Sequence, residues 1–240
     1  MVLCSSGIAT PSHFASDHRP QAEPQRPVTR PQIRTLIITT QAISVQWGVD
    51  DALTRKEQIY LTAGKLFSEL GYHATSMRDL AKALGVQGGS LYAHIEGKEE
   101  LLWEIVNRAA DEFDAALEPV RDSDLEPAVK LRAALEAHMM VIERTLDWAT
   151  VFFHDWKHLS GDRLERIAAR RDKIERVFRQ ILEEGVRKGV FRASLDVKLA
   201  AVLALSSANW AYHWFNPAGR FTAKEVADAF AAMLLDGLRT

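Results

Sequence analysis

Two histidines and an aspartate near the middle of the chain have the residue types and spacing to bind a metal ion. His154 and His158 are four residues apart, which places both imidazoles on one face of a helix, and Asp155 lies between them. The sequence offers no third ligand at an obvious spacing and no His-Glu-x-x-His motif. It also lacks a glycine-rich phosphate loop after a strand, a nucleophile elbow and a convincing pair of catalytic carboxylates. We expect no metal, no cofactor and no enzymatic activity; a metal-dependent helical enzyme is the remote alternative.

Aromatic side chains gather around these histidines and suit an apolar ligand. One cluster occupies nine residues from position 148, and a second follows near the C-terminus. Aromatic pockets with a few polar groups are typical of small-molecule sites, although a single aromatic residue is more often part of the core. The residues expected to bind a ligand are His138, Ile142, Trp148, Phe152, Phe153, Trp156, Arg170, Arg171, Lys173, Ile174, Trp210 and Trp214.

Basic residues supply a charge that such a ligand could use. Residues 160–192 hold ten Lys and Arg against six Asp and Glu, the strongest positive bias in the chain. Arg170, Arg171 and Lys173 lie in this segment, where they could hold a phosphate group. The alternative is a solvated helix face whose charges pair one turn apart.

The stretch that most strongly indicates a function is residues 75–102. Ser76 and Asp79 have the spacing of a capping box at the start of a short helix. Gly85 supplies the left-handed residue that ends this helix. A second short helix is expected over residues 87–95. Two short helices joined by a tight turn are the plan of a helix-turn-helix, whose second helix enters the major groove of DNA.

A longer helix is expected before this pair, over residues 55–71, and another begins at Lys98. Residues 54–102 as a whole resemble the N-terminal DNA-binding domain of TetR-family transcriptional regulators. The matching motifs, in order, are Ala63-Gly64-Lys65-Leu66-Phe67, Gly71-Tyr72, Thr75-Ser76-Met77-Arg78-Asp79-Leu80-Ala81, Gly85-Val86, Gly89-Ser90-Leu91-Tyr92 and Lys98-Glu99-Glu100-Leu101. No single motif is decisive, but all of them occur in order at the family spacing.

The resemblance implies which side chains meet DNA. Leu91 and Ile95 should face inward, so Tyr92 and His94 should face the groove. Gln87 stands where the family usually has a small hydroxyl residue and is a poorer helix cap. The residues expected to contact DNA are Thr75, Ser76, Arg78, Gln87, Gly88, Gly89, Ser90, Tyr92, His94 and Lys98.

Charge argues for specific rather than general DNA binding. The net charge of the 240 residues is −2, and residues 51–100 hold six Lys and Arg against seven Asp and Glu. This balance counts against strong nonspecific binding. Phosphate contacts can still come from hydroxyls and backbone N–H groups.

The composition also indicates the cellular compartment in which the protein is expected to work. A single cysteine, Cys4, excludes a disulfide framework and suits a reducing cytoplasm. No apolar run reaches the length of a membrane span, and the N-terminus lacks the order of a signal peptide. We expect a cytoplasmic protein without a membrane partner.

Three segments are expected, in an all-α fold. Residues 1–50 contain five of the eight prolines and have the composition of a disordered extension, whose arginines could alternatively form a DNA-contacting arm. Residues 51–100 should be the three-helix helix-turn-helix DNA-binding domain, and residues 101–240 the helical effector-binding and dimerisation domain. Within the latter, helices are expected over residues 98–117 (ended by Pro119), 125–146, 148–159, 160–190, 196–215 and 222–238.

The last two expected helices carry a surplus of apolar residues, including Leu203 and Phe230. This pattern favours a homodimer held by a four-helix bundle between two subunits. The resemblance implies the same, since TetR-type regulators dimerise through their last two long helices. The alternative is that both faces are buried within one subunit.

Residues 148–216 resemble a narrower group within that family, the regulators of fatty-acid and sterol-ring breakdown that respond to acyl-CoA thioesters. The matching motifs are Phe152-Phe153, Trp156, Leu159-Ser160-Gly161, Ala169-Arg170-Arg171-Asp172, Glu184-Gly185, Asn209-Trp210 and Trp214 with Pro217. We therefore predict a ligand-responsive regulator, a repressor released from a near-palindromic double-stranded DNA operator by a small effector such as an acyl-CoA. A helical small-molecule carrier without DNA binding is the alternative.

Overall fold

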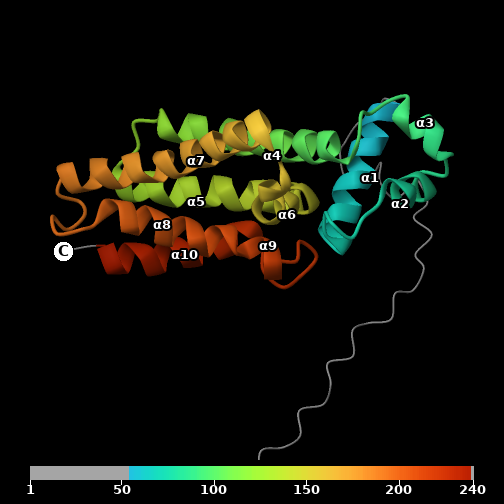
Figure 1. Cartoon of the computed structure of the whole chain (residues 1–240). Helices are drawn as coiled ribbons and strands as arrows, with labels where there is room; N and C mark the ends of the chain where they lie inside the picture. The colour runs from blue at the N-terminus through green and yellow to red at the C-terminus, as the bar shows by residue number, and fades with distance from the viewer. Residues whose placement is uncertain (1–53, 239–240) are drawn as a thin grey trace, which may run out of the picture. The chain divides into compact units, whose positions relative to one another are not determined.

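The computed structural model describes residues 54–238, and every regular element in this range is a helix (Figure 1). The elements are α1 (Arg55–Leu70), α2 (Met77–Ala83), α3 (Gly88–Tyr92), α4 (Lys98–Arg121), α5 (Pro127–Arg144), α6 (Leu146–His154), the 3-10 turn η2 (Trp156–His158), α7 (Gly161–Arg187), α8 (Val197–Asn209), α9 (Ala211–Trp214) and α10 (Ala223–Leu238). The expected all-α class, with an N-terminal helix-turn-helix and a helical body after it, is confirmed. The expected extension over residues 1–50 lies outside the described residues.

Local capping interactions define the helix-turn-helix. The Ser76 hydroxyl accepts a hydrogen bond from the Asp79 backbone, and the Asp79 carboxylate accepts one from the Ser76 backbone, which is the expected capping box. Gly85 has a φ of 65° and ends α2 as predicted. α3 is shorter than the predicted 87–95. The shortening is at the C-terminal end, where the His94 backbone N–H donates to the Leu91 carbonyl three residues back and the chain turns out of the helix. Gln87 provides no side-chain cap at the other end.

α4 is longer than expected and continues past Pro119 to Arg121. The prediction that Pro119 ends the helix was wrong. Proline removes only its own N–H, and the Asp122 backbone still donates to the Glu118 carbonyl at 3.1 Å, so the last turn persists.

Other boundaries shift for similar local reasons. α5 starts at Pro127, because the fixed φ of proline suits the first position of a helix. The expected helix over 148–159 is split into α6 and η2, and that over 196–215 is split at Trp210. Gly189, with a φ of 70°, follows the end of α7.

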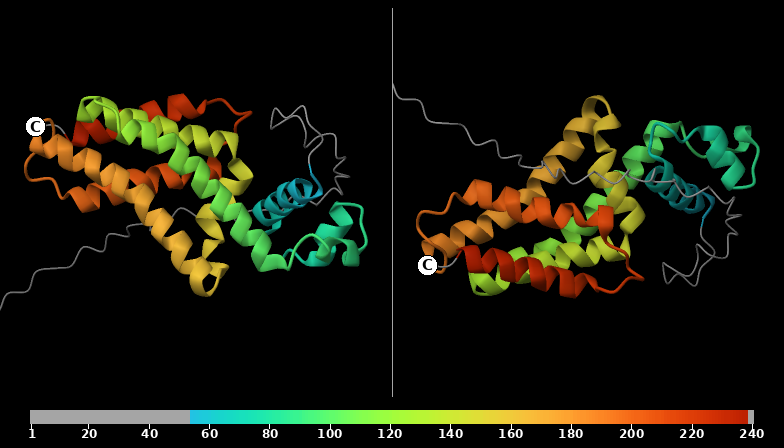
Figure 2. Two further views of the ribbon diagram at one scale, coloured as in Figure 1. Left: turned by 90° about the horizontal axis from the view of Figure 1, so that it is seen from above. Right: turned by 90° about the horizontal axis from the view of Figure 1, so that it is seen from below.

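α5 lies at the centre of the body. It packs against α4, α7 and α10, and Figure 2 shows α10 running alongside α5 and α7 alongside α4. Leu131, Leu135 and Met139 of α5 are fully buried, as are Phe113 of α4 and Phe178 of α7. Burial of this apolar surface is the main term holding the body together. None of the described helices is both long and apolar enough to cross a membrane.

α1 packs against α4 and α6 and so joins the helix-turn-helix to the body. A Cβ atom at Gly64 would lie 2.5 Å from Nε1 of Trp148, so glycine is what lets α1 approach this indole. Arg108 of α4 donates two hydrogen bonds to the Glu57 carboxylate, at 2.6 and 2.9 Å, and thereby lowers the pKa of Glu57. Trp148, expected in the ligand site, instead fills this interface.

Candidate functional site

α3 presents its polar side outward. Leu91 and Ile95 are buried, whereas Tyr92 is 57% exposed and His94 is exposed, as the sequence predicted. Gln87, Gly88, Gly89 and Ser90 are also exposed. The first turn of α3 and its outward face are therefore free to contact DNA.

Neighbouring residues of α2 complete this surface. Ser76 and Arg78 are not buried, and a hollow of about 460 Å³ between α2 and α3 is bordered by Arg78, Lys82 and Tyr92. Thr75 differs from the expectation, because it is buried and its hydroxyl donates to the carbonyls of Leu66 and Gly71. Thr75 therefore stabilises the loop before α2 rather than contacting DNA.

Lys98 was expected to bind a phosphate, but its ammonium group already has partners within the protein. Its Nζ lies 4.2 Å from the centre of the Tyr72 ring and donates to the His73 carbonyl at 3.4 Å. Burial lowers the pKa of Lys98 below its usual value. In this arrangement Lys98 holds the start of α4 against the loop before α2.

The same loop meets η2 through a pair of histidines. Nε2 of His73 lies 2.9 Å from Nδ1 of His158, and the His158 ring stacks on Tyr72 with centres 5.5 Å apart. The buried Asp155 carboxylate is 3.7 Å from the other nitrogen of His158. Burial and the neighbouring His73 lower the pKa of His158. These contacts connect the helix-turn-helix to the end of α6, which was not foreseen.

The metal site considered from sequence finds no support in the described part of the chain. His154 and His158 both approach Asp155, but residues 54–238 contain no group of three or more His, Cys, Asp and Glu side chains that could hold a metal ion.

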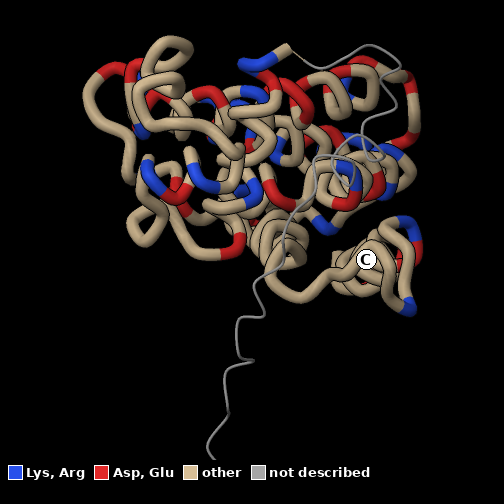
Figure 3. The backbone as a smooth tube through the Cα atoms, turned by 90° about the vertical axis from the view of Figure 1, so that its right-hand side faces the viewer, with Lys and Arg blue, Asp and Glu red and all other residues tan. Residues whose placement is uncertain are grey.

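The charges of this end of the molecule are mixed. Figure 3 shows Lys and Arg interspersed with Asp and Glu along the described backbone, without a block of one sign. A surface with this mixture of charges could bind DNA only through a few well-placed contacts.

An aromatic cluster forms the centre of the candidate effector site. The Phe113 ring lies 4.6 Å from His138, 5.4 Å from Phe152 and 5.5 Å from Phe153, measured between ring centres. Phe153 also stacks on Tyr212, with ring centres 5.7 Å apart. The sequence pointed to three of these residues; Phe113 and Tyr212 come from helices distant in sequence and carried no local signal.

His138 is fully buried among these rings. Burial lowers its pKa from 6.5 to about 4, although the neighbouring Asn209 acts in the opposite direction. Neither ring nitrogen of His138 has a hydrogen-bond partner of good geometry among the described residues, and neither has Oδ1 of Asn209. His138 is therefore neutral at physiological pH.

Arg171 closes one side of the cluster. Its guanidinium carbon lies 4.8 Å from the Trp156 ring, 5.0 Å from Phe152 and 5.6 Å from Phe153, and it donates to the Phe152 carbonyl at 3.0 Å. Burial lowers the pKa of Arg171 to about 10. No carboxylate in residues 54–238 forms an ion pair with it. A cation held among aromatic rings without a counter-ion is suited to an anionic ligand.

Arg170 and Lys173, assigned with Arg171 to the same role, are already neutralised. Arg170 lies 2.7 Å from both Asp111 and Asp114, and Lys173 lies 3.0 Å from Glu118. These pairs bind α7 to α4, so the expected phosphate-binding triad is reduced to Arg171.

The remaining predicted ligand residues divide into core and surface. Ile142 and Ile174 are buried in the core. Trp210 and Trp214 are exposed; Trp210 lies 6.2 Å from Tyr212, while Trp214 meets Phe230. Trp210 can border the aromatic cluster, whereas Trp214 belongs to the surface of α8–α10.

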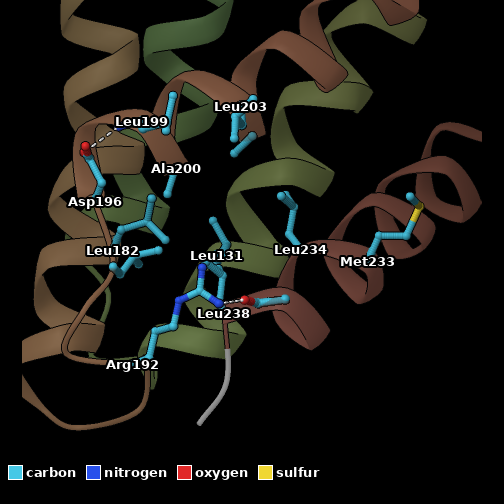
Figure 4. Close-up of a pocket in the computed structure, with 13 residues that line it drawn as sticks. Leu131, Leu182, Arg192, Asp196, Leu199, Ala200, Leu203, Met233, Leu234 and Leu238 are labelled. Carbon is cyan, nitrogen blue, oxygen red and sulfur yellow. Dashed lines mark hydrogen bonds between the residues drawn. The ribbon is translucent and has the colours of Figure 1, made fainter. Parts of the chain in front are cut away.

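An apolar groove lies between the N-terminal part of α8 and the C-terminal part of α10 (Figure 4). Its volume is about 250 Å³, and its lining includes Leu199, Leu203, Met233 and Leu234. Met233 is 76% exposed and Leu203 55% exposed. Figure 4 also shows Arg192 donating to the Gly237 carbonyl at the end of the groove. Exposed apolar side chains of this size typically mark an interface.

Comparison with known proteins identifies the family of both the N-terminal and the C-terminal region. Residues 59–105 match the family described as bacterial regulatory proteins, tetR family, and residues 124–238 match the tetracyclin repressor-like C-terminal domain. Over 185 residues the chain is 30% identical to the HTH-type transcriptional repressor KstR2 of Rhodococcus jostii, and the match covers 77% of this chain and 91% of that protein.

Solved structures of regulators are similar to this chain as well. The TetR-family regulator PfmR from Thermus thermophilus is 40% identical with a TM-score of 0.69, covering 76% of this chain and 99% of that one. AibR, in complex with isovaleryl coenzyme A and operator DNA, is 30% identical with a TM-score of 0.69, covering 75% and 98% of the respective chains.

The neutral, buried His138 predicts that the folded state loses stability as the pH falls. The unfolded chain takes up a proton at its usual pKa of 6.5, whereas the folded chain does so only near 4. The contribution is therefore complete above pH 6.5 and decreases as the pH falls toward 4. Between pH 7 and pH 5 we expect a loss of about 2 kcal/mol in the free energy of unfolding. Urea unfolding at these two pH values measures it. His138→Leu should lack this component; an equal loss in both proteins would show that His138 does not cause it.

Proposed function

Because the chain belongs to the TetR family of bacterial regulatory proteins, we propose that it is a transcriptional repressor released from its operator by an acyl-CoA thioester. The observation that carries the effector assignment is Arg171, a partly buried cation among aromatic rings without a carboxylate partner in the described chain. An acyl-CoA combines an anionic head with an apolar acyl group, and so matches both features. The neighbour AibR was solved with isovaleryl coenzyme A and DNA, which supports this class.

The DNA-binding part of the proposal assigns residues 51–100 to operator recognition and 101–240 to effector binding and dimerisation. Two α3 helices of a homodimer, roughly 34–36 Å apart, would read successive major grooves of a near-palindromic operator. Tyr92, His94, Ser90 and Gln87 would meet the bases. Ser76, Arg78 and the backbone of Gly88 and Gly89 would meet phosphates.

Release would follow from a change in the spacing of the two α3 helices. An effector shifts this equilibrium only by its difference in affinity for the two states. α4 and the contact between His73 and His158 connect the body to the helix-turn-helix, so a displacement of α6 or α7 by the ligand would be passed toward α2 and α3.

Tyr92→Ala tests the recognition helix. The side chain is exposed on α3, so its removal should leave the fold intact while operator affinity falls by about 1–3 kcal/mol, which is about fivefold to 150-fold. Operator selected from genomic fragments serves as the probe in a fluorescence anisotropy titration at fixed salt. The control is Gln180→Ala, an exposed position of α7, which should bind as the wild type does. Unchanged affinity of the Tyr92 variant would refute the assignment.

Leu203→Glu tests the dimer. A charge within the exposed apolar face of α8 should separate the subunits and weaken operator binding, because one half-site alone binds weakly. The matched control is Leu125→Glu, at a 40% exposed leucine between α4 and α5, which should remain dimeric. Light scattering at micromolar concentration reports the mass. A monomeric wild type would contradict the dimer, and a dimeric Leu203 variant would contradict this interface.

Arg171→Gln and Arg170→Gln test the effector site as a pair. Loss of the unpaired Arg171 should weaken acyl-CoA binding by about tenfold to a hundredfold, because a charge-assisted hydrogen bond is removed. Arg170→Gln should leave that affinity within about threefold and instead destabilise the α4–α7 contact by about 1–3 kcal/mol. Calorimetry with a panel of acyl-CoA esters and the free acids measures binding. Equal effects of the two substitutions, or equal binding of esters and free acids, would contradict the assignment.

A further inference from the structure

Two histidines meet where the loop before α2 touches the turn η2. Nε2 of His73 lies 2.9 Å from Nδ1 of His158, and the centres of the two rings are 4.0 Å apart. The His158 ring also stacks on Tyr72. Because residues 71–76 lead directly into the capping box of α2, this contact holds the start of the helix-turn-helix against the body. We call the pair of His73 and His158 the histidine latch.

The hydrogen bond of the histidine latch depends on how many protons the two rings carry. A neutral imidazole has one N–H donor and one acceptor nitrogen, whereas a charged imidazole has two donors and no acceptor. The bond between His73 and His158 needs one donor and one acceptor, so it persists while at least one ring is neutral. When both rings are charged, hydrogens occupy both facing nitrogens and two like charges lie side by side. The bond is then lost.

Charges from several neighbouring elements face His158. At the end of α6, the Asp155 carboxylate lies 3.7 Å from Nε2 of His158 and 3.0 Å from Nδ1 of His154. From α4, the Lys98 ammonium donates to the carbonyl of His73 at 3.4 Å. Burial and the facing His73 lower the pKa of His158 below its usual value of 6.5. Asp155 acts in the opposite direction, whereas His154 and Lys98 lower this pKa further.

Other charged groups beside η2 are engaged with different partners. The Glu99 carboxylate of α4 accepts hydrogen bonds from the backbone and the hydroxyl of Ser160, at 3.0 and 2.8 Å. Lys157 of η2 and Arg171 of α7 lie over the Trp156 ring, 5.8 and 4.8 Å from its centre. We therefore assign the response of this junction to pH to the two histidines of the latch.

We propose that the histidine latch makes operator binding depend on pH: when both rings are charged, the loop before α2 separates from η2 and operator affinity falls. The closed latch holds one orientation of the helix-turn-helix, so that the two α3 helices of a dimer are already positioned for both half-sites. Once the latch opens, DNA binding has to order this segment again, and part of the affinity is lost. The inference rests on operator binding by the proposed dimer and is independent of the effector.

The effect on folding has the same sign. The pKa of His158 is lower in the folded chain than its usual value of 6.5. The contribution of the latch to stability is therefore complete above pH 6.5 and is lost as the pH falls through the lowered pKa. Acid thus weakens the contact that closes the latch.

A double-mutant cycle tests the latch without DNA. Thermal melts compare the wild type, His73→Phe, His158→Phe and the double variant at about pH 7.5 and about pH 5. Phenylalanine keeps a ring at each position and removes both nitrogens. At the higher pH the effects of the two substitutions should not add, because each removes the same bond. At the lower pH the wild type has itself lost the bond, so the effects should add. Additive effects at the higher pH, or the same non-additivity at both, would overturn the latch.

Operator titrations test whether the latch controls DNA binding. At about pH 7.5, His158→Phe should bind the selected operator about threefold to tenfold more weakly than the wild type. At about pH 5 the two proteins should agree within about twofold, because the wild-type latch has opened. Comparison at equal pH cancels the effect of protons on other groups, such as His94 of α3.

Two further variants separate the proton from the ring. His158→Asn places an amide oxygen near the position of Nδ1 and does not titrate, so it should accept from His73 at either pH. We expect this variant to bind the operator more tightly than the wild type at about pH 5. The control is His154→Gln, a mostly exposed histidine of the same segment, which should follow the wild type within about twofold at both pH values.

The outcomes separate this inference from the proposals beneath it. If the ratio of the His158→Phe and wild-type affinities is the same at both pH values, protons do not act through the latch and the inference is wrong. If the melts show the pH-dependent bond but His158→Phe binds the operator as the wild type does, the latch is structural and does not control DNA binding. If the wild type binds no operator at either pH, the DNA-binding assignment fails and the inference with it. Failure of acyl-CoA esters to bind would contradict the effector proposal alone.

Discussion

The unbroken course of α4 is the constraint on which the other contacts depend. Its first turns bury Leu101 and Leu102 beneath α1, its middle places Phe113 in the aromatic cluster, and its acidic side chains hold α7 through Arg170. An α-helix transmits displacement as a stiff rod, with a rise of about 1.5 Å per residue. The helix-turn-helix and the candidate effector site therefore both pack against this one helix. Neither can be repositioned without α4, and the contact of Gly64 with Trp148 ties α1 to the same frame.

Much of the fold could be predicted because its signals are local. The capping box of Ser76 and Asp79, the left-handed Gly85 and the inward pair of Leu91 and Ile95 all depend on residues within two helical turns. The order and spacing of the helix-turn-helix motifs also indicated the TetR family. Errors occurred where a rule about one residue was applied too strictly. Pro119 removes a single hydrogen bond near the end of a helix that is otherwise well held, so α4 continues past it.

The candidate effector site was only partly predictable, because contacts between distant segments decide its charges. Arg170 and Arg171 are the same residue type at adjacent positions, yet they point about 100° apart around the helix axis. One reaches the aspartates of α4, and the other reaches the aromatic cluster. Trp148 is of a residue type that often lines ligand sites, but in the structure it packs against Gly64 of α1. No periodicity in the sequence distinguishes these cases, since the partner lies on another helix.

The interspersed charges of the helix-turn-helix have a consequence for how the operator is found. Nonspecific residence on DNA comes almost entirely from Lys and Arg on phosphates. Residues 51–100 hold no excess of these, and the Lys98 ammonium lies over the Tyr72 ring. We therefore expect weak nonspecific binding by this segment, so that sliding along the genome would contribute little to the search for the operator. The same charge balance would favour complete release, because few Lys and Arg of residues 51–100 remain to hold the protein on flanking DNA once the specific contacts are lost.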